Sequence, residues 1–185
     1  MKKINIFVII ATFLLILFSN LYYVSFDKDF YEDRIKEKEF GKVLNYLENG
    51  EEIKGDYFNS KEKLHLKDVK ELFDIVKFII LTSLLVLVLS YWYLRKKIFF
   101  NSVKVGCLIL LIFILVLLLF SFFDFTKLFF GFHELVFTND LWLLNPETDN
   151  LINLLPEKIF EEIVFRLGLF VGISSLVLVF LIKKY

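Results

Sequence analysis

Apolar residues along this chain are gathered into four long runs instead of recurring at a single helix face. The runs cover approximately residues 4–24, 72–94, 105–123 and 163–182. A helix needs roughly 20 apolar residues to cross the hydrocarbon core of a bilayer, and each run is close to that length. The pattern therefore predicts an all-α integral membrane protein with four transmembrane helices.

The charged residues give these helices an expected orientation. All 22 acidic residues lie within 27–74 and 124–162, whereas the remaining helix ends are flanked only by Lys and Arg. Those basic residues are Lys2, Lys3, Arg95, Lys96, Lys97, Lys104, Lys183 and Lys184. Because Lys and Arg concentrate in short cytoplasmic loops, both termini are expected in the cytoplasm. Residues 25–71 and 124–162, here called the first and second cap segments, are expected to form a small extracytoplasmic cap.

The chain is expected to form a single membrane domain over residues 1–185. The first apolar run lacks a small-x-small cleavage site, so it is expected to remain as a signal anchor. Gly168 and Gly172 in the fourth run form a small-xxx-small pair, a spacing that permits close helix packing. Cys107 is the only cysteine, which excludes an intrachain disulfide and favours a buried apolar role.

The first cap segment is highly charged but shows helical periodicity. Three apolar residues stand at i, i+4 and i+7, namely Phe40, Leu44 and Leu47. This spacing predicts an amphipathic helix over about 29–49, ended by Gly50. Residues 51–58 are expected to be irregular or to include a short extended segment.

A second helix is predicted to begin at the end of this segment. Asn59 and Glu62 have the spacing of a capping box, so the helix should start there and continue into the second apolar run. His65 would then lie in its second turn. Asp68 follows three residues later and would lie on the same side of the helix.

The second cap segment is unusually aromatic for a region expected outside the membrane. Seven phenylalanines and Trp142 fall within or beside it, the former being Phe122, Phe123, Phe125, Phe129, Phe130, Phe132 and Phe137. A segment this apolar is expected to lie along the membrane surface. Asn145 and Pro146 mark a turn, and Pro156 suits the start of a helix that continues into the fourth run.

His65 and His133 are the only histidines, and one falls in each cap segment. Imidazole is the side chain that titrates near neutrality without perturbation. A shared aromatic-lined pocket would suit the pair for acid–base catalysis. A structural role for each histidine is the competing interpretation.

Other polar residues are candidates for supporting roles. A carboxylate that bonds an imidazole nitrogen can fix its tautomer, and the candidates are Asp68, Asp140 and Asp149. Trp142 suits either an interfacial anchor or a pocket wall. Arg166 lies just inside the fourth run, where it must pair with a group such as Glu162, a lipid phosphate or a substrate group.

Several function classes find no support in the sequence. It has no motif for nucleotide binding, serine hydrolysis or thiolate zinc ligation, and no H-E-x-x-H. The spacing of His65 and His133 carries no metal signature. We therefore expect no cofactor, no metal and no nucleic-acid partner.

Two motifs resemble those of a known family. Residues 132–142, FHELVFTNDLW, resemble the F-H-x-x-F-F-x-N-D-x-W segment of the bacterial lipoprotein intramolecular transacylases, and the resemblance continues through 145–160. Residues 62–70, EKLHLKDVK, resemble the family's E-x-x-H-M-x-D-V-[KR] stretch. Leu66 replaces the usual Met and Val136 replaces a frequent Phe, both conservatively.

The resemblance implies a membrane acyltransferase of the bacterial cell membrane, with its active site facing outward. Such an enzyme moves the sn-2 acyl chain of a diacylglyceryl lipoprotein to the α-amino group of the N-terminal cysteine, giving the lyso-form. The partners implied are the diacylated lipoprotein and membrane lipid. The catalytic residues would be His65 and His133. The substrate-binding or orienting residues would be Asp68, Asn139, Asp140, Trp142, Asp149 and Arg166.

Two other functions remain open from the sequence. One is a non-enzymatic membrane protein whose aromatic cap binds a lipid or protein partner. The other is a metal-dependent membrane hydrolase. Neighbouring histidines would favour catalysis, and widely separated ones would favour binding.

Overall fold

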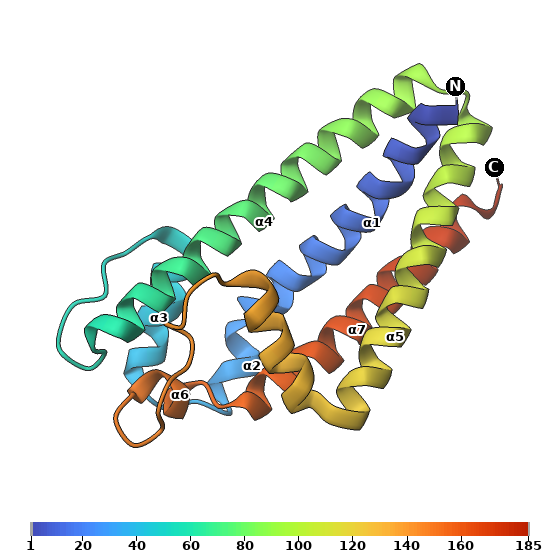
Figure 1. The fold of residues 1–185 in the computed structure, drawn as a ribbon. Helices are drawn as coiled ribbons and strands as arrows, with labels where there is room; N and C mark the ends of the chain where they lie inside the picture. The colour runs from blue at the N-terminus through green and yellow to red at the C-terminus, as the bar shows by residue number, and fades with distance from the viewer. Residues whose placement is uncertain (1, 185) are drawn as a thin grey trace. The chain divides into compact units, whose positions relative to one another are not determined.

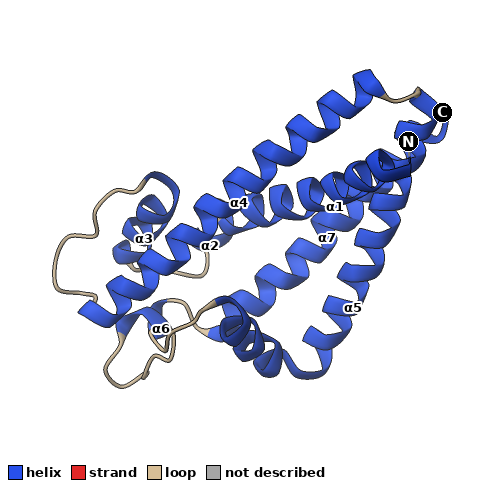
Figure 2. Ribbon diagram, turned by 45° about the horizontal axis from the view of Figure 1, so that its top comes forward, coloured by secondary structure: helices blue, strands red, loops and turns tan. Residues whose placement is uncertain are grey.

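The computed structural model describes residues 2–184, so Met1 and Tyr185, the two ends of the expected single domain, lie outside the described residues. Every regular element in the described range is a helix (Figures 1 and 2). The elements are α1 (Lys2–Ser25), α2 (Lys28–Glu32), α3 (Lys38–Asn49), α4 (Ser60–Tyr93), α5 (Lys96–Val136), α6 (Asn150–Leu154), α7 (Glu157–Leu181) and the short 3-10 helix η1 (Ile182–Lys184). The predicted all-α class is confirmed.

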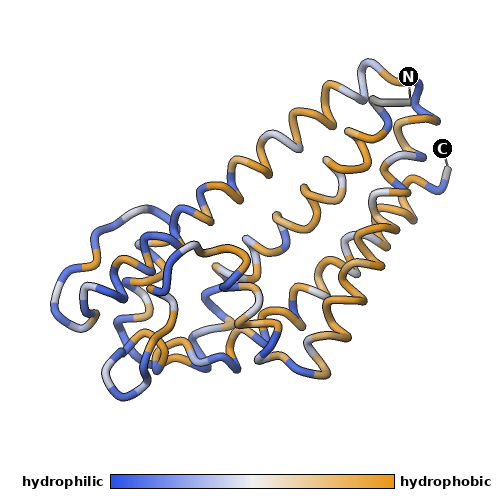
Figure 3. Tube along the Cα trace, viewed as in Figure 1, coloured by the Kyte–Doolittle hydropathy of each residue, from blue (hydrophilic) through white to orange (hydrophobic). Residues whose placement is uncertain are grey.

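Four helices, α1, α4, α5 and α7, are long and apolar enough to cross a membrane. Figure 3 shows the apolar residues following one another along these helices. Each of the four predicted runs falls within one of them to within a residue at its ends. Exposed leucine, isoleucine, valine and phenylalanine side chains are numerous on all four, as expected of surfaces that face lipid.

The chain divides into two compact units, which are described separately. Unit 1 comprises Met1–Val24, Val76–Leu119 and Val164–Tyr185, and unit 2 comprises Ser25–Ile75 and Phe120–Ile163. The two cap segments both lie in unit 2, together with His65 and His133.

Unit 1 is held together by tight helix contacts at small residues. A Cβ placed on Gly106 of α5 would lie 2.8 Å from the carbonyl oxygen of Ile9 and 2.9 Å from Cβ of Thr12, both on α1. A Cβ on Gly168 would meet Leu118 at 2.7 Å, whereas one on Gly172 would meet nothing within 4 Å. Of the predicted glycine pair, only Gly168 therefore makes a close contact.

The core of unit 1 includes a cluster that α1, α5 and the chain end share. Its buried members are Val8, Leu94, Phe99, Val103, Cys107 and Ile182. Cys107 is fully buried among them, in agreement with its predicted role as a small apolar residue.

In unit 2, the predicted helix over 29–49 is two helices. α2 ends at Glu32 and α3 begins at Lys38, with extended backbone at Glu37 (φ −72°, ψ 126°). The break lets Tyr31 and Phe40 meet, with ring centroids 4.6 Å apart, although they come from different helices. The prediction of one continuous helix was wrong because this tertiary contact overrides the local periodicity.

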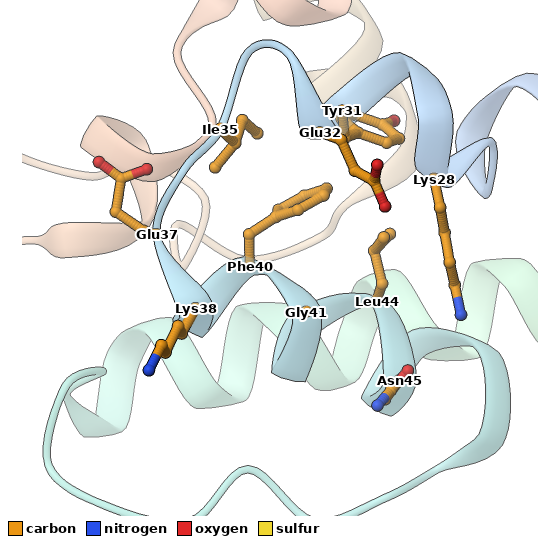
Figure 4. Close-up of a pocket in the computed structure, with 10 residues that line it drawn as sticks. All are labelled: Lys28, Tyr31, Glu32, Ile35, Glu37, Lys38, Phe40, Gly41, Leu44 and Asn45. Atoms are coloured by element: carbon orange, nitrogen blue, oxygen red, sulfur yellow. The ribbon is translucent and has the colours of Figure 1, made fainter.

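Residues of α2, α3 and the segment between them also line an open pocket of about 260 Å³ (Figure 4). It contains none of the predicted site residues. Its lining residues are Lys28, Tyr31, Glu32, Ile35, Glu37, Lys38, Phe40, Gly41, Leu44 and Asn45.

The end of α3 follows the prediction. Gly50 adopts a left-handed conformation (φ 78°) and its N–H donates to the Tyr46 carbonyl, an arrangement that glycine adopts without steric cost. Residues 51–58 are irregular and form no strand.

α5 has a break at Asp124, whose φ and ψ are −160° and 82°. The carboxylate of Asp124 accepts a hydrogen bond from the Lys127 N–H (3.0 Å), so it caps the second part of the helix. The apolar run predicted over 105–123 ends at this break. Residues 125–136 then form a separate helical stretch in unit 2, and this stretch carries His133.

The glycine contacts of unit 1 give a first prediction. Gly106→Ala should lower the thermal stability of the detergent-solubilised protein, because overpacking typically costs about 1–3 kcal/mol and the obstructing Ile9 oxygen belongs to the backbone. Gly172→Ala is the matched control and should leave stability unchanged or slightly raised. Equal melting temperatures for the two variants would contradict the close contact between α1 and α5.

Candidate active site

His65 is placed by the start of α4. The predicted capping box is present, since the Asn59 N–H donates to Oε2 of Glu62 (2.7 Å) and the Glu62 N–H donates to Oδ1 of Asn59 (3.0 Å). These two bonds satisfy N–H groups that the first turn of a helix leaves without intrahelical partners. His65 follows in the second turn and is only 7% exposed.

His133 lies on the second part of α5, one turn after Phe129. Its Nδ1 is 2.7 Å from the Phe129 carbonyl oxygen. A carbonyl oxygen only accepts hydrogen bonds, so Nδ1 must carry the proton. In the neutral ring, Nε2 then holds the free lone pair.

The two imidazoles are neighbours. Their ring centroids are 6.2 Å apart and their planes meet at 37°. Phe137 contacts both, at 5.2 Å from His65 and 5.6 Å from His133. The structure therefore brings the two predicted catalytic residues together.

Aromatic rings enclose the His133 side of the pair. The ring of Trp142 lies 5.0 Å from that of His133, and Phe129 and Phe132 lie 4.3 Å and 5.4 Å from it. Trp142 also contacts Phe130 at 5.7 Å. Of its two predicted roles, the contact with His133 fits a wall of the site.

Burial keeps both imidazoles neutral near pH 7. His65 precedes the apolar run of α4, and its pKa is lowered to about 4, first by desolvation and then by the neighbouring His133, against an opposing effect of Asp68. Desolvation also lowers the pKa of His133, while the hydrogen bond to Phe129 acts in the opposite direction. A neutral imidazole can accept a proton at one nitrogen and donate a hydrogen bond from the other, and the imidazolium that forms can return the proton.

Asp68 and Asn139 form a hydrogen bond next to the histidines. Nδ2 of Asn139 donates to Oδ2 of Asp68 at 3.0 Å. This bond joins α4, one turn beyond His65, to the loop that follows α5. The exposed Asp140 is the next residue of that loop.

Asp149 lies at the far end of the same loop. Its carboxylate accepts from Nδ2 of Asn59 (2.8 Å) and from the N–H of Asn145 (2.7 Å), and the Asn145 bond is the chief reason that its pKa is lowered. Within residues 2–184, none of the three candidate carboxylates is hydrogen-bonded to an imidazole. The Phe129 carbonyl fixes the His133 tautomer instead.

Glu62 has a second role that the sequence did not indicate. Its side chain is fully buried, and its Oε1 accepts a hydrogen bond from the N–H of Leu151 in α6 (2.6 Å). The capping box was visible in the sequence. The bond to Leu151 was not, because it joins residues 89 positions apart.

Arg166 lies in unit 1, over the ring of Phe170 at 5.9 Å. Glu162, considered above as its partner, lies in unit 2 and pairs with Arg34 at 2.6 Å. Arg166 thus belongs to a different unit from the histidines, Trp142, Asp68 and Asn139. Among the residues that the structure describes, no cluster of three or more His, Cys, Asp or Glu is arranged to hold a metal ion.

Comparison with known proteins adds a family. The family model described as "Lipoprotein intramolecular transacylase Lit" matches residues 3–160. Among curated proteins, none matches the sequence.

Three solved structures of the membrane-integral lipoprotein intramolecular transacylase Lit from Bacillus cereus have the same fold. One has a TM-score of 0.83 at 23% identity, covering 99% of this chain and 94% of the other. The other two are variants in which one histidine is replaced by arginine or alanine, and both have TM-scores of 0.76 at 23% identity, covering 99% of this chain. These two matches cover 90% of the arginine variant's chain and 92% of the alanine variant's chain.

The family match extends from α1 into α7 and includes both histidines, and the solved structures share the membrane-integral helical fold. The chain therefore belongs to the lipoprotein intramolecular transacylase family and is a multi-pass membrane acyltransferase.

Proposed function

We propose that this protein transfers the sn-2 acyl chain of a diacylglyceryl lipoprotein to the α-amino group of its N-terminal cysteine, giving the lyso-form. The observation that carries the proposal is the pair of neutral imidazoles, with centroids 6.2 Å apart, among aromatic rings. Family membership supports acyl transfer as the reaction class. Ester aminolysis is downhill, so neither a cofactor nor an energy source is required.

His133 is the better candidate for the general base. Its Nδ1 proton is held by the Phe129 carbonyl, which leaves the Nε2 lone pair for the substrate. A free α-amino group has a pKa near 7.7–8.0, so a neutral imidazole can take its proton as the N–C bond forms. This proton transfer converts His133 to an imidazolium, which then returns the proton to the glyceryl oxygen as the ester C–O bond breaks.

His65 suits the role of hydrogen-bond donor to the developing oxyanion. Its pKa of about 4 keeps it neutral throughout the physiological range, and a neutral N–H can stabilise an oxyanion without first gaining a proton. Its buried Nδ1 has no hydrogen-bond partner among the described residues. The imidazole is therefore not committed to a protein acceptor through that nitrogen.

The aromatic rings contribute orientation and dryness. The ester and the amine belong to one molecule, so holding that molecule in a reactive conformation captures the rate advantage of intramolecular reactions. We propose that Trp142, held against His133, is one wall of the substrate site. We also propose that Asp68, Asn139 and Asp149 orient the substrate. Direct contacts of Asp140 and Arg166 with substrate stay predictions.

The charge distribution supports one orientation of the protein in the membrane. The basic flanks described above support both termini in the cytoplasm and both cap segments outside. The lipoprotein substrate would then be modified at the outer face of the bacterial cell membrane.

The binding-only alternative gains less from the structure. Widely separated histidines would favour a protein that only binds a partner, but the two histidines are neighbours. A docking surface also gives no reason for a buried imidazole, His65, beside a second, half-buried one, His133.

The direct test is mass spectrometry of the N-terminal peptide of a diacylated lipoprotein co-expressed with this protein. One acyl chain should move from the glyceryl group to the α-amine with the wild type. His65→Ala and His133→Ala should each abolish the shift while the proteins remain in the membrane fraction. Full activity of either variant would contradict the two-histidine mechanism.

The two assigned roles predict an asymmetry between glutamine variants. His133→Gln should be as inactive as His133→Ala, because a general base contributes about 10²–10⁴-fold and an amide cannot replace it. His65→Gln keeps an N–H donor and should be more active than His65→Ala. Initial rates in proteoliposomes measure both ratios, and a more active His133→Gln would reverse the assignment.

The lowered pKa values predict the titration of the histidines. In a histidine-labelled sample, NMR should show His65 remaining neutral down to about pH 5, with His133 titrating below 6.5, the reference value of imidazole. The sign follows from burial, which disfavours the charged imidazolium. Midpoints at or above 6.5 for both rings would contradict the dry environment.

A further inference from the structure

The loop between α5 and α6 runs alongside the first turns of α4 in the opposite direction. Three side-chain hydrogen bonds tie the loop to the helix. In order along the loop, the pairs are Asn139 with Asp68, the Leu143 carbonyl with Lys61, and Asp149 with Asn59. His65 lies between the first and last of these attachment points on α4, and Trp142 lies between them on the loop.

Two of these three hydrogen bonds are exposed to solvent, whereas a fourth residue that holds the loop, Glu62, is buried. The bonds of Asp68 and Lys61 are exposed, and exposed polar pairs contribute little to stability. Glu62, by contrast, is 0% exposed, and its carboxylate accepts two short hydrogen bonds, of 2.7 Å and 2.6 Å. A buried carboxylate needs such donors, because leaving it unpaired is very costly.

The two donors to Glu62 come from different parts of unit 2. One is the N–H of Asn59, the residue that caps α4, and the other is the N–H of Leu151 in the first turn of α6. Asn59 in turn donates to Asp149, two residues before Leu151. One buried group thus fastens the end of the loop to the beginning of α4.

This fastening sets what His65 faces. Glu62 and His65 are three residues apart and share a face of α4. The opposing rings, His133, Phe137 and Trp142, all belong to the chain just before or within the loop. The spacing between α4 and this chain is therefore also the spacing between the two imidazoles.

We propose that Glu62 is a positioning residue for the transacylation, holding the loop against α4 so that His65 stays opposite His133. Glu62 acts through these backbone bonds and takes no proton from the substrate. The inference rests on the proposed function, but the geometry on which it depends can be tested without substrate.

Glu62→Gln is the first test, because the amide replaces one acceptor oxygen with a donor that would face a backbone N–H. In the folded, membrane-reconstituted protein, kcat should fall roughly tenfold or more, since a displacement on the order of 1 Å can cost about 10²-fold in rate. KM should change much less. His65 should also titrate closer to 6.5, its reference value, because it loses burial.

Asn59→Asp is the second test and keeps the helix cap, because Asp and Asn cap helices equally well. It replaces the side-chain donor of Asn59 with a carboxylate that faces the Asp149 carboxylate. Their repulsion should loosen the attachment of the end of the loop to the start of α4, which Glu62 also holds. The expected changes in kcat and in the His65 titration have the same direction as for Glu62→Gln. If Glu62→Gln does not fold, Asn59→Asp alone decides the question.

Arg34→Gln is the matched control. It breaks the ion pair with Glu162 inside unit 2 and touches neither histidine, so kcat per folded molecule and the His65 titration should both be unchanged. Wild-type kcat and titration in folded Glu62→Gln or Asn59→Asp would overturn the proposal. An inactive wild type would instead refute the proposed function, and the His65 titration of the variants would still test the positioning role.

Discussion

The site depends on how the loop after α5 is held against the first turns of α4. The two histidines come from separate cap segments, and neither segment alone would place an imidazole beside the other. Glu62 links the segments by a buried carboxylate that accepts N–H groups from both. Its burial makes the link expensive to break, whereas the ties at Asp68 and Lys61 are exposed. The arrangement of His65, His133 and Trp142 follows from this constraint.

Once together, the histidines are useful because their surroundings are dry. Desolvation lowers the pKa of both rings, so both are neutral near pH 7, as the proposed roles of His133 as base and His65 as hydrogen-bond donor require. The Phe129 carbonyl determines which nitrogen of His133 is available. In the proposed reaction the chain supplies the base, the hydrogen-bond donor and the confinement, while the substrate brings its own nucleophile and electrophile.

The sequence predicted those features that local patterns encode. The four apolar runs, the Gly50 terminus of α3, and the Asn59–Glu62 capping box each depend on residues close in sequence, and each is present. The break between α2 and α3 was missed because the contact between Tyr31 and Phe40 outweighs the helical periodicity. The bonds of Glu62 to Leu151 and of Asp149 to Asn59 join distant residues, so no local pattern could show them. Because its bond to Asn59 was not visible in the sequence, Asp149 was considered as a partner of an imidazole, whereas it bonds Asn59 and Asn145.

In the proposed reaction, one substrate molecule is held between the two imidazoles while its own acyl chain moves. The most direct measurement is a crossover experiment with purified protein in proteoliposomes. It uses two lipoproteins of different peptide mass, only one of which carries a deuterated sn-2 chain. We expect the N-acyl product of the labelled peptide to keep all of the deuterium, and His133→Ala to form no product. Deuterated acyl chains on the unlabelled peptide would contradict it.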